Sequence, residues 1–156
     1  MSVPTWKRKL SSAEYVYQLY QLNIRLGKVL ENKPQKYKHN YTDEIIKTAL
    51  QALKHVQTAD SIYLTKYSTE RDFRQRREHL LEARGQIQFI ATACYVFLEI
   101  VRTRDYASEN EHKQDIARLY DQEMEIGDRC EHCYNLVSGV IKADSELYNK
   151  FIKART

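Results

Sequence analysis

The chain has 156 residues, of which 42% are hydrophobic and 29% charged, so it can bury one proper core and is not a disordered chain. Only 4 Gly and 2 Pro occur, which excludes a turn-rich β architecture and favours long helices. The net charge of +4 is uneven, because residues 1–105 carry +7 and residues 106–156 carry −3. The basic part favours an anionic partner, such as nucleic acid or an anionic membrane surface, although an ordinary solvated helix surface also explains it.

The sequence shows neither a membrane-spanning run nor a secretory signal. No apolar stretch approaches the ~20 residues that a membrane span needs. The first ten residues are basic in part and contain no apolar h-region. With three Cys and no signal, we expect reduced thiols, a cytoplasmic location and no membrane partner.

The first helix follows a flexible arm, residues 1–10, and begins near Ser11 or Ser12, either of which can cap it. Its apolar residues recur at spacings of three and four, which is typical of a helix face that packs on a core. We call such a row of positions a seam. This first seam comprises Tyr15, Leu19, Leu22, Leu26 and Val29, and it stops before Pro34.

The second and third helices follow a loop at residues 32–41. Thr42 is expected to cap the second helix, and Ser68 or Thr69 the third. The second seam comprises Ile46, Ala49, Leu53, Val56, Asp60 and Tyr63. The third comprises Phe73, Arg76, Leu80, Ala83, Ile87, Ile90, Cys94, Phe97 and Val101.

The fourth helix is expected to open with a capping box formed by Ser108 and Glu111. Its seam comprises Ile116, Leu119, Glu123, Ile126, Cys130, Cys133, Val137 and Val140. Residues 144–156 are expected to form a separate helical tail. Short connections require neighbouring helices to alternate in direction. The sequence thus predicts an all-α, antiparallel up-down four-helix bundle with a short C-terminal helical tail, in one domain spanning residues 1–156.

Extra apolar residues outside the seams favour an oligomer. They are Val16, Tyr20 and Ile24 in the first helix and Leu81, Ala91, Tyr95 and Leu98 in the third. A second apolar stripe is typical of packing against another subunit, and a wide core face in a monomer is the alternative. The 12 Tyr point the same way, because Tyr is enriched at interfaces.

Two features could indicate chemistry, and both lie on seams. The pair Cys130 and Cys133 has C-x-x-C spacing, which can hold zinc or perform redox reactions, but it falls in mid-helix without paired ligands elsewhere. Asp60 and Glu123 could belong to a di-metal bundle site, but no Glu-x-x-His occurs, and a partly buried contact with Arg76 explains them more simply. We expect core packing, no metal and no cofactor.

No phosphate-binding glycine loop and no nucleophile elbow occurs, so we expect a protein without catalytic residues. The remaining signal is basic. One cluster, in the first loop, comprises Lys33, Lys36, Tyr37, Lys38 and His39; the other, in the third helix, comprises Arg71, Arg74, Arg76, Arg77 and Arg84. Such side chains bind phosphates, although acidic neighbours neutralise the second cluster in part. Topology places the two clusters at opposite ends of the bundle.

Three segments resemble the accessory variability determinants, which are four-helix-bundle proteins of diversity-generating retroelements. The segments read AEYVYQLYQLNIRLGKVLENKPQKYKHNY, DEIIKTALQALKHVQTADSIY and ERDFRQRREHLLEARGQIQFIATACYVFLEI, and the likeness covers about residues 13–104. It depends on the order of the helices and on short stretches of similar sequence, not on a catalytic motif. The family is similar in fold to helix bundles encoded within ribosomal RNA intervening sequences. Residues 106–156, which form the acidic fourth helix and the tail, depart from the family.

The resemblance implies a non-enzymatic homopentamer with a basic surface. Such proteins bind the retroelement's reverse transcriptase and nucleic acid, and they support mutagenic retrohoming, in which template RNA is copied into cDNA. The matching basic positions are Arg25, Lys28, Lys33, Lys36, Lys38, Arg74, Arg76, Arg77 and Arg84. The alternatives are a protein-interaction bundle with no nucleic-acid role and, third, a di-metal or redox bundle enzyme.

Overall fold

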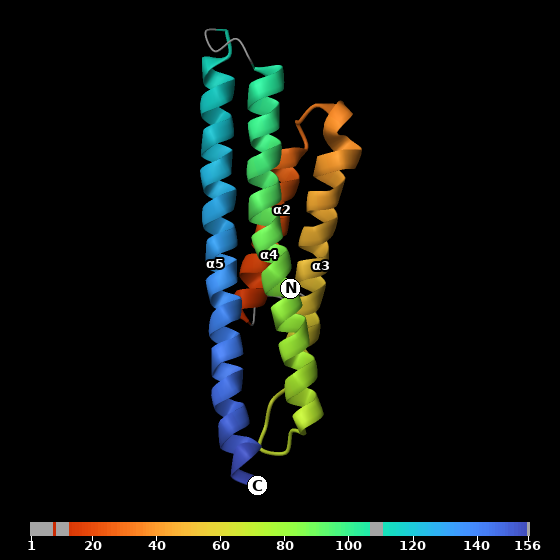
Figure 1. Cartoon of the computed structure of the whole chain (residues 1–156), viewed down its shortest axis with the longest axis vertical. Coiled ribbons are helices and arrows are strands. Elements are labelled where there is room, and N and C mark those ends of the chain that lie inside the picture. Colours follow the sequence, from red (N-terminus) through yellow and green to blue (C-terminus); the bar gives the residue numbers. More distant parts are fainter. Residues whose placement is uncertain (1–7, 9–12, 107–110, 156) are drawn as a thin grey trace, which may run out of the picture.

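The computed structural model describes residues 8, 13–106 and 111–155, and it consists of four long helices and three short turns. The long helices are α2 (Glu14–Leu30), α3 (Asp43–Asp60), α4 (Glu70–Asp105) and α5 (Lys113–Phe151). The turns are η1 (Gln35–Tyr37), η2 (Lys38–Thr42) and η3 (Lys153–Arg155). The four helices lie side by side, and α4 and α5 are roughly twice as long as their neighbours (Figure 1). The predicted all-α four-helix fold is confirmed.

Contacts between the helices define two ends of the molecule. At the Asp105 end, Tyr37 of η1 donates a hydrogen bond of 2.8 Å to Asp105 at the end of α4. At the Asp144 end, the connection between α3 and α4 lies against η3, where Arg155 donates to the Ser68 carbonyl oxygen at 3.0 Å. The Asp105 end is at the top of Figure 1 and the Asp144 end at the bottom. None of the described helices is both long enough and apolar enough to cross a membrane.

The core confirms two predicted seams and corrects a third. The apolar seam residues of α2 and α4 are buried. In α3, however, the buried residues are Ile45, Ala49, Ala52, Val56 and Ala59. The predicted Ile46 and Tyr63 are instead 36% and 75% exposed. Alanines make up most of the inner face of α3, so the larger apolar residues do not mark its buried side.

The helix ends were predicted with mixed success. Thr69 caps α4 in a capping box with Asp72, as expected for this position. Thr42 does not cap α3, because η2 runs directly into that helix and the Thr42 hydroxyl donates to the Lys38 carbonyl oxygen. Residues 32–41 were expected to be a loop, but most of them form the helical turns η1 and η2.

The fourth helix differs most from its prediction. It begins at Lys113 with His112 as its N-cap residue, so Glu111 lies outside it. It then continues to Phe151, and the predicted break before a separate tail does not occur. The inner face uses Ile141 (9% exposed), whereas the predicted Val140 is only partly buried. The predicted cap residues Ser11, Ser12 and Ser108 lie outside the described residues, and so does the predicted arm at residues 1–10 apart from Arg8.

Candidate nucleic-acid interface

Several of the predicted phosphate-binding cations are engaged within the protein. Arg25 of α2 makes two hydrogen bonds with Glu125 of α5, and Lys36 pairs with Asp105 at 2.6 Å. The ammonium group of Lys33 donates to Gln122 at 2.8 Å, and burial, helped by nearby Arg118, lowers the pKa of Lys33. These side chains tie α2 and the first connection to α4 and α5, and a phosphate would have to compete with those contacts.

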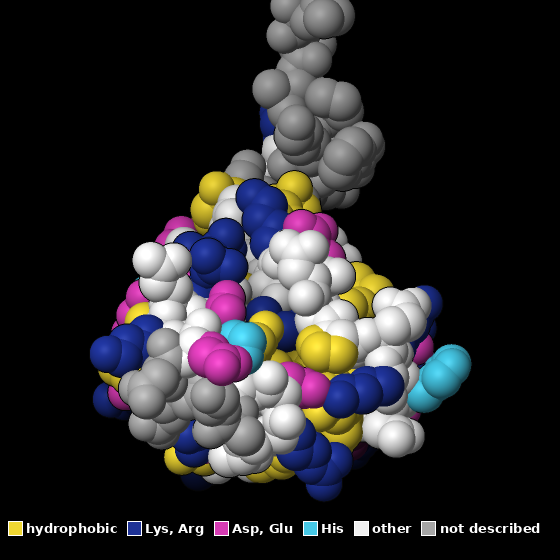
Figure 2. Space-filling model, turned by 90° about the horizontal axis from the view of Figure 1, so that it is seen from above, with side chains coloured by type: hydrophobic (Ala, Val, Ile, Leu, Met, Phe, Trp, Pro, Cys, Tyr) yellow, Lys and Arg dark blue, Asp and Glu magenta, His cyan; other side chains and the backbone are white. Residues whose placement is uncertain are grey.

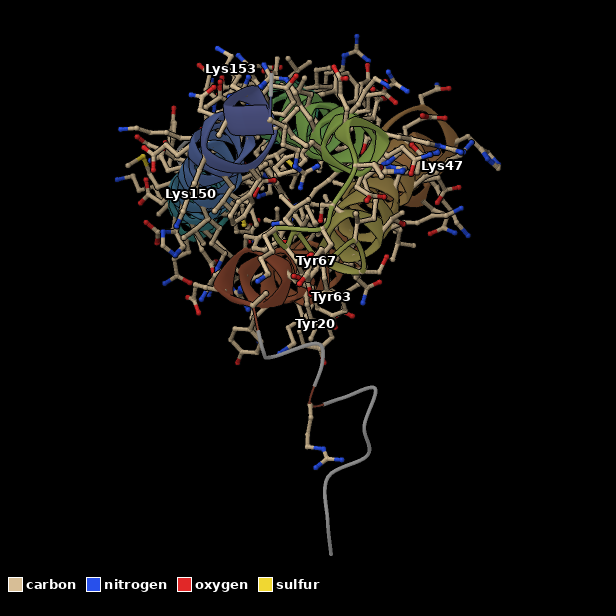
Figure 3. The ribbon with its side chains drawn as sticks, turned by 90° about the horizontal axis from the view of Figure 1, so that it is seen from below. Tyr20, Lys47, Tyr63, Tyr67, Lys150 and Lys153 are labelled. Atoms are coloured by element: carbon tan, nitrogen blue, oxygen red, sulfur yellow. The ribbon has the colours of Figure 1, made fainter. Side chains whose placement is uncertain are left out.

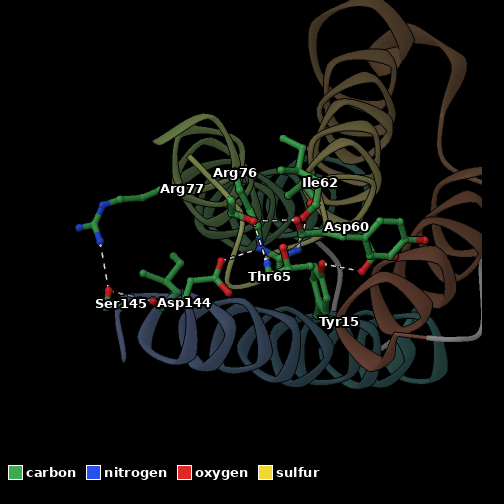
Figure 4. Close-up of polar contacts among 12 residues, drawn as sticks. Tyr15, Asp60, Ile62, Thr65, Arg76, Arg77, Asp144 and Ser145 are labelled. Atoms are coloured by element: carbon green, nitrogen blue, oxygen red, sulfur yellow. Dashed lines mark hydrogen bonds and ion pairs between the residues drawn. The ribbon is translucent and has the colours of Figure 1, made fainter. Parts of the chain in front are cut away.

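Arg76 is an internal structural residue and not a surface cation (Figure 4). Its Nε lies 2.6 Å from Asp144 Oδ2, and its Nη1 donates to the carbonyl oxygens of Ala59 and Ile62. Asp60 makes the expected partly buried polar contact, but its hydrogen bond of 2.9 Å comes from the Tyr15 hydroxyl, and it acts on Arg76 only through its charge. The direct partner of Arg76 is Asp144, which lies on another helix, 68 residues along the chain.

Arg84, Lys28 and Lys38 do not gather into one site. Arg84 lies over the ring of Tyr134, 5.5 Å from its centroid, and donates to Ser138 at 3.3 Å. Lys28 and Lys38 are exposed, and their ammonium groups make no hydrogen bond or ion pair with a described residue.

Arg74 and Arg77 line a groove between the start of α4 and the end of α5. The groove has a volume of about 380 Å³, and its lining includes Arg74, Arg77, Phe73, Ser145, Tyr148 and Lys153. Two rings form one wall, because Phe73 and Tyr148 pack edge to face with centroids 5.5 Å apart. Arg77 reaches Ser145 at 3.4 Å and is otherwise exposed.

The acidic side chains of this groove already have partners. Asp144 is paired with Arg76, and Glu70 accepts a hydrogen bond from the Tyr148 hydroxyl at 3.2 Å. Arg74 and Arg77 therefore face the groove without a carboxylate partner in the described structure. Two guanidinium groups beside aromatic rings suit a ligand that combines phosphate groups with flat bases.

The Asp105 end is less suited to an anion, because its positive and negative side chains alternate. Figure 2, which looks onto this end, shows Lys and Arg interspersed with Asp and Glu. Ion pairs explain the pattern, since Lys36 contacts Asp105, and Arg102 contacts Glu99 at 2.8 Å. In the first-loop cluster Lys36 is neutralised by Asp105 and Lys33 is held by Gln122, whereas Lys38 is exposed. The groove, which two arginines face, is the stronger candidate.

The three cysteines, Cys94, Cys130 and Cys133, lie together in the core as reduced thiols, which confirms that the C-x-x-C pair is packed in the interior. Burial raises the pKa of Cys94 and Cys133 to about 12, and it raises the pKa of Cys130 as well. Thiols that stay protonated are poor nucleophiles. In residues 8, 13–106 and 111–155, no group of three His, Cys, Asp or Glu side chains could hold a metal ion.

Glu123 is the one seam carboxyl group with unusual chemistry. Burial, together with the neighbouring carboxyl group of Glu99, raises the pKa of Glu123 to about 7. Its Oε1 atom is buried and has no hydrogen-bond partner among the described residues. Arg102 donates to Glu99 and lowers the pKa of that residue, so Glu99 is ionised in the pH range in which Glu123 binds and releases its proton.

Sequence reasoning missed the α5 side of the groove. Ser145 and Tyr148 contact residues of α4 that precede them by 68 and 78 positions. No local spacing signals such a contact, and the only hint was that the tail contained Lys150 and Lys153.

A comparison of the chain with protein-family models, with curated proteins and with solved structures finds no match.

Proposed function

We propose that the protein is a non-enzymatic scaffold that binds single-stranded RNA and its complementary DNA through the groove of Arg74 and Arg77. The observation that carries this proposal is the pair of exposed guanidinium groups beside the ring of Tyr148, in a groove where Asp144 is paired with Arg76 and Glu70 accepts a hydrogen bond from Tyr148. Arginine binds phosphate by charge and by paired hydrogen bonds, and aromatic rings can stack on bases.

The resemblance to accessory variability determinants extends the proposal to partners. The protein would bind the reverse transcriptase of a diversity-generating retroelement, support mutagenic retrohoming and assemble as a homo-oligomer, a pentamer by that likeness. We also infer the up-down antiparallel topology, since η2 and α3 contact α4 in opposite order along the two chains: Tyr41 of η2 stacks on Phe97, whereas His55 of α3 meets His79. The raised thiol pKa values disfavour the redox-enzyme alternative.

The experiment measures the affinity for single-stranded RNA and DNA at several salt concentrations, for the wild-type chain and for Arg74→Ala/Arg77→Ala. The matched control is Lys47→Ala/Lys54→Ala, which removes two exposed cations from α3. We expect the arginine variant to bind more weakly than the control, with unchanged helicity. A wild-type chain that binds neither RNA nor DNA at low salt contradicts the proposal.

A protein-interaction scaffold is the second candidate, and exposed apolar side chains on two helices favour it. Phe89 and Val96 of α4 are 52% and 45% exposed and lie seven residues apart, on one face. On α3, Leu50 is 55% exposed beside Ile46. The mass in solution and co-purification with the reverse transcriptase test this alternative; protein binding without RNA or DNA binding would favour it.

A further inference from the structure

The connection between α3 and α4, residues 61–69, exposes two tyrosine rings to solvent. Tyr63 is 75% and Tyr67 79% exposed, which makes them the two most exposed large apolar side chains in the described structure. Lys66 lies between them in sequence, with its ammonium group 5.1 Å from the centre of the Tyr67 ring. In the view from the Asp144 end, Tyr63 and Tyr67 lie on the α2 side of the bundle, and Lys150 and Lys153 lie on the α5 side (Figure 3).

The backbone of this connection is fixed by hydrogen bonds within it. Ser68 is 5% exposed, and its Oγ accepts a hydrogen bond of 2.8 Å from the Thr65 amide. The same hydroxyl donates to the Tyr63 carbonyl oxygen, and the Tyr67 amide donates to Thr65 Oγ1 at 3.1 Å. The positions of both tyrosines are therefore set by the small hydroxyl residues around them.

Two arginines from other elements hold the same backbone from outside. Arg76 of α4 donates to the Ile62 carbonyl oxygen at 3.2 Å (Figure 4). Arg155 of η3 donates to the carbonyl oxygens of Lys66 and Ser68. Contacts from two distant parts of the chain thus fix a connection whose largest side chains make little contact with the protein. Fixing the backbone in advance lowers the entropy that binding would cost.

The charged side chains near Tyr63 and Tyr67 bear on which class of ligand the two rings can bind. Residues 61–69 contain no Asp or Glu, and the flanking Asp60 and Glu70 accept hydrogen bonds from Tyr15 and Tyr148. Within residues 61–69 the one charged side chain is that of Lys66, and the guanidinium group of Arg155 lies against its carbonyl oxygen, while the carboxylates of Asp60 and Glu70 flank the connection. Exposed aromatic rings interleaved with cations are typical of surfaces on which successive bases of a single strand stack.

We propose that residues 61–69 form a stacking platform on which Tyr63 and Tyr67 bind bases of single-stranded nucleic acid. The proposal depends on the nucleic-acid function proposed above and adds the site that contacts bases, whereas the groove contacts phosphates. Both sites lie at the Asp144 end, because residues 61–69 lead into α4, whose first turns line the groove.

The test compares three probes: a single-stranded oligouridylate, an abasic strand of equal length and an RNA duplex. Tyr63→Ala/Tyr67→Ala is set against Tyr95→Ala, which removes a ring that is 59% exposed on α4, and against Tyr63→Phe/Tyr67→Phe, which keeps both rings. Stacking of about 1–3 kcal/mol per base predicts a loss of at least about fivefold per ring for the oligouridylate. The abasic strand and the duplex should lose less than about twofold, and both control variants should bind as the wild type does.

The outcomes separate this inference from the proposed function. An unchanged affinity of Tyr63→Ala/Tyr67→Ala for the oligouridylate overturns the platform, and so does an equal loss for the abasic strand. If Arg74→Ala/Arg77→Ala still weakens binding in that case, the groove stands and the platform alone is wrong. A wild-type chain that binds none of the three probes overturns both.

Discussion

The guanidinium group of Arg76 on α4 and the carboxylate of Asp144 on α5 form an ion pair, with Nε 2.6 Å from Oδ2. The two side chains are only 13% and 12% exposed. Because Arg76 also donates to the carbonyl oxygens of Ala59 and Ile62, it ties α4 to α5 and to the end of α3. The same arginine thus stabilises the end of the molecule on which the groove and the platform lie.

Removal of Arg76 is expected to destabilise the fold strongly. Arg76→Ala would leave Asp144 and two carbonyl oxygens without their partner, which typically costs about 3–5 kcal/mol. The control Arg77→Ala removes an exposed arginine one residue away and should cost less than about 0.5 kcal/mol. Urea denaturation followed by circular dichroism measures both free energies of unfolding. Equal stability of the two variants would show that the buried pair is unimportant.

Replacing both partners should be milder than replacing one. Arg76→Met/Asp144→Leu removes the ion pair without leaving a buried charge, and such replacements are often neutral or stabilising. The two carbonyl oxygens still lose a donor, so we expect the double variant to lie between Arg76→Ala and the wild type. A double variant less stable than Arg76→Ala would contradict this order.

The salt dependence of binding should report the groove arginines. Each phosphate contact on a single strand contributes about 0.7 to the slope of log affinity against log salt concentration. If Arg74 and Arg77 each contact one phosphate, the double alanine variant should lower that slope by about 1.4. Titrations of single-stranded RNA over a range of salt concentrations measure it. The same slope in variant and wild type would place the phosphate contacts elsewhere, for instance at Lys28 and Lys38.

The raised pKa of Glu123 predicts that the folded chain loses stability as the pH rises. Its pKa is raised to about 7 in the folded chain, whereas an unfolded Glu has a pKa of about 4.3. Between these values the folded state binds more protons than the unfolded state, so stability falls as the pH increases through this window. The lowered pKa of Glu99 acts in the opposite sense and matters only at lower pH.

The variant Glu123→Gln should remove that pH dependence. A neutral amide at this position still contacts Glu99 and never ionises, so stability should change less between about pH 5 and pH 8 than in the wild type. The variant should also be the more stable protein at about pH 8. Denaturation at several pH values tests this, with Glu131→Gln, an exposed carboxyl on the same helix, as the control. A wild-type stability that rises over this range would refute the assignment.

The three cysteines should be unreactive in the folded protein. Their burial and raised pKa values keep the thiols protonated and covered, so a thiol reagent should react slowly until the chain is denatured, when all three react. Elemental analysis of purified protein should find no stoichiometric zinc. One equivalent of zinc per chain, or fast labelling of Cys130 or Cys133 in the native state, would overturn core packing as their role.

The sequence alone predicted the helices and much of the core. The three-and-four spacing from Tyr15 to Val29 and from Phe73 to Val101 identified the buried faces of α2 and α4, because periodicity follows directly from helix geometry. Thr69, one of the two predicted caps of α4, is the cap in the structure, because capping depends on residues only three positions apart. In α3, size misled the prediction, since Ala52 and Ala59 are buried whereas the larger Ile46 and Tyr63 are not.

Only the tertiary structure decided which cations face solvent. Arg74, Arg76 and Arg77 look alike in sequence. Arg76, however, forms an ion pair with Asp144, whereas Arg74 and Arg77 line the groove. The connection that carries Tyr63 and Tyr67 is likewise held by Arg76 and by Arg155, which lies 87 residues along the chain from its partner Ser68. Helical periodicity reports short-range geometry, whereas the pairing of a charge depends on residues that folding brings from 68 or more positions away.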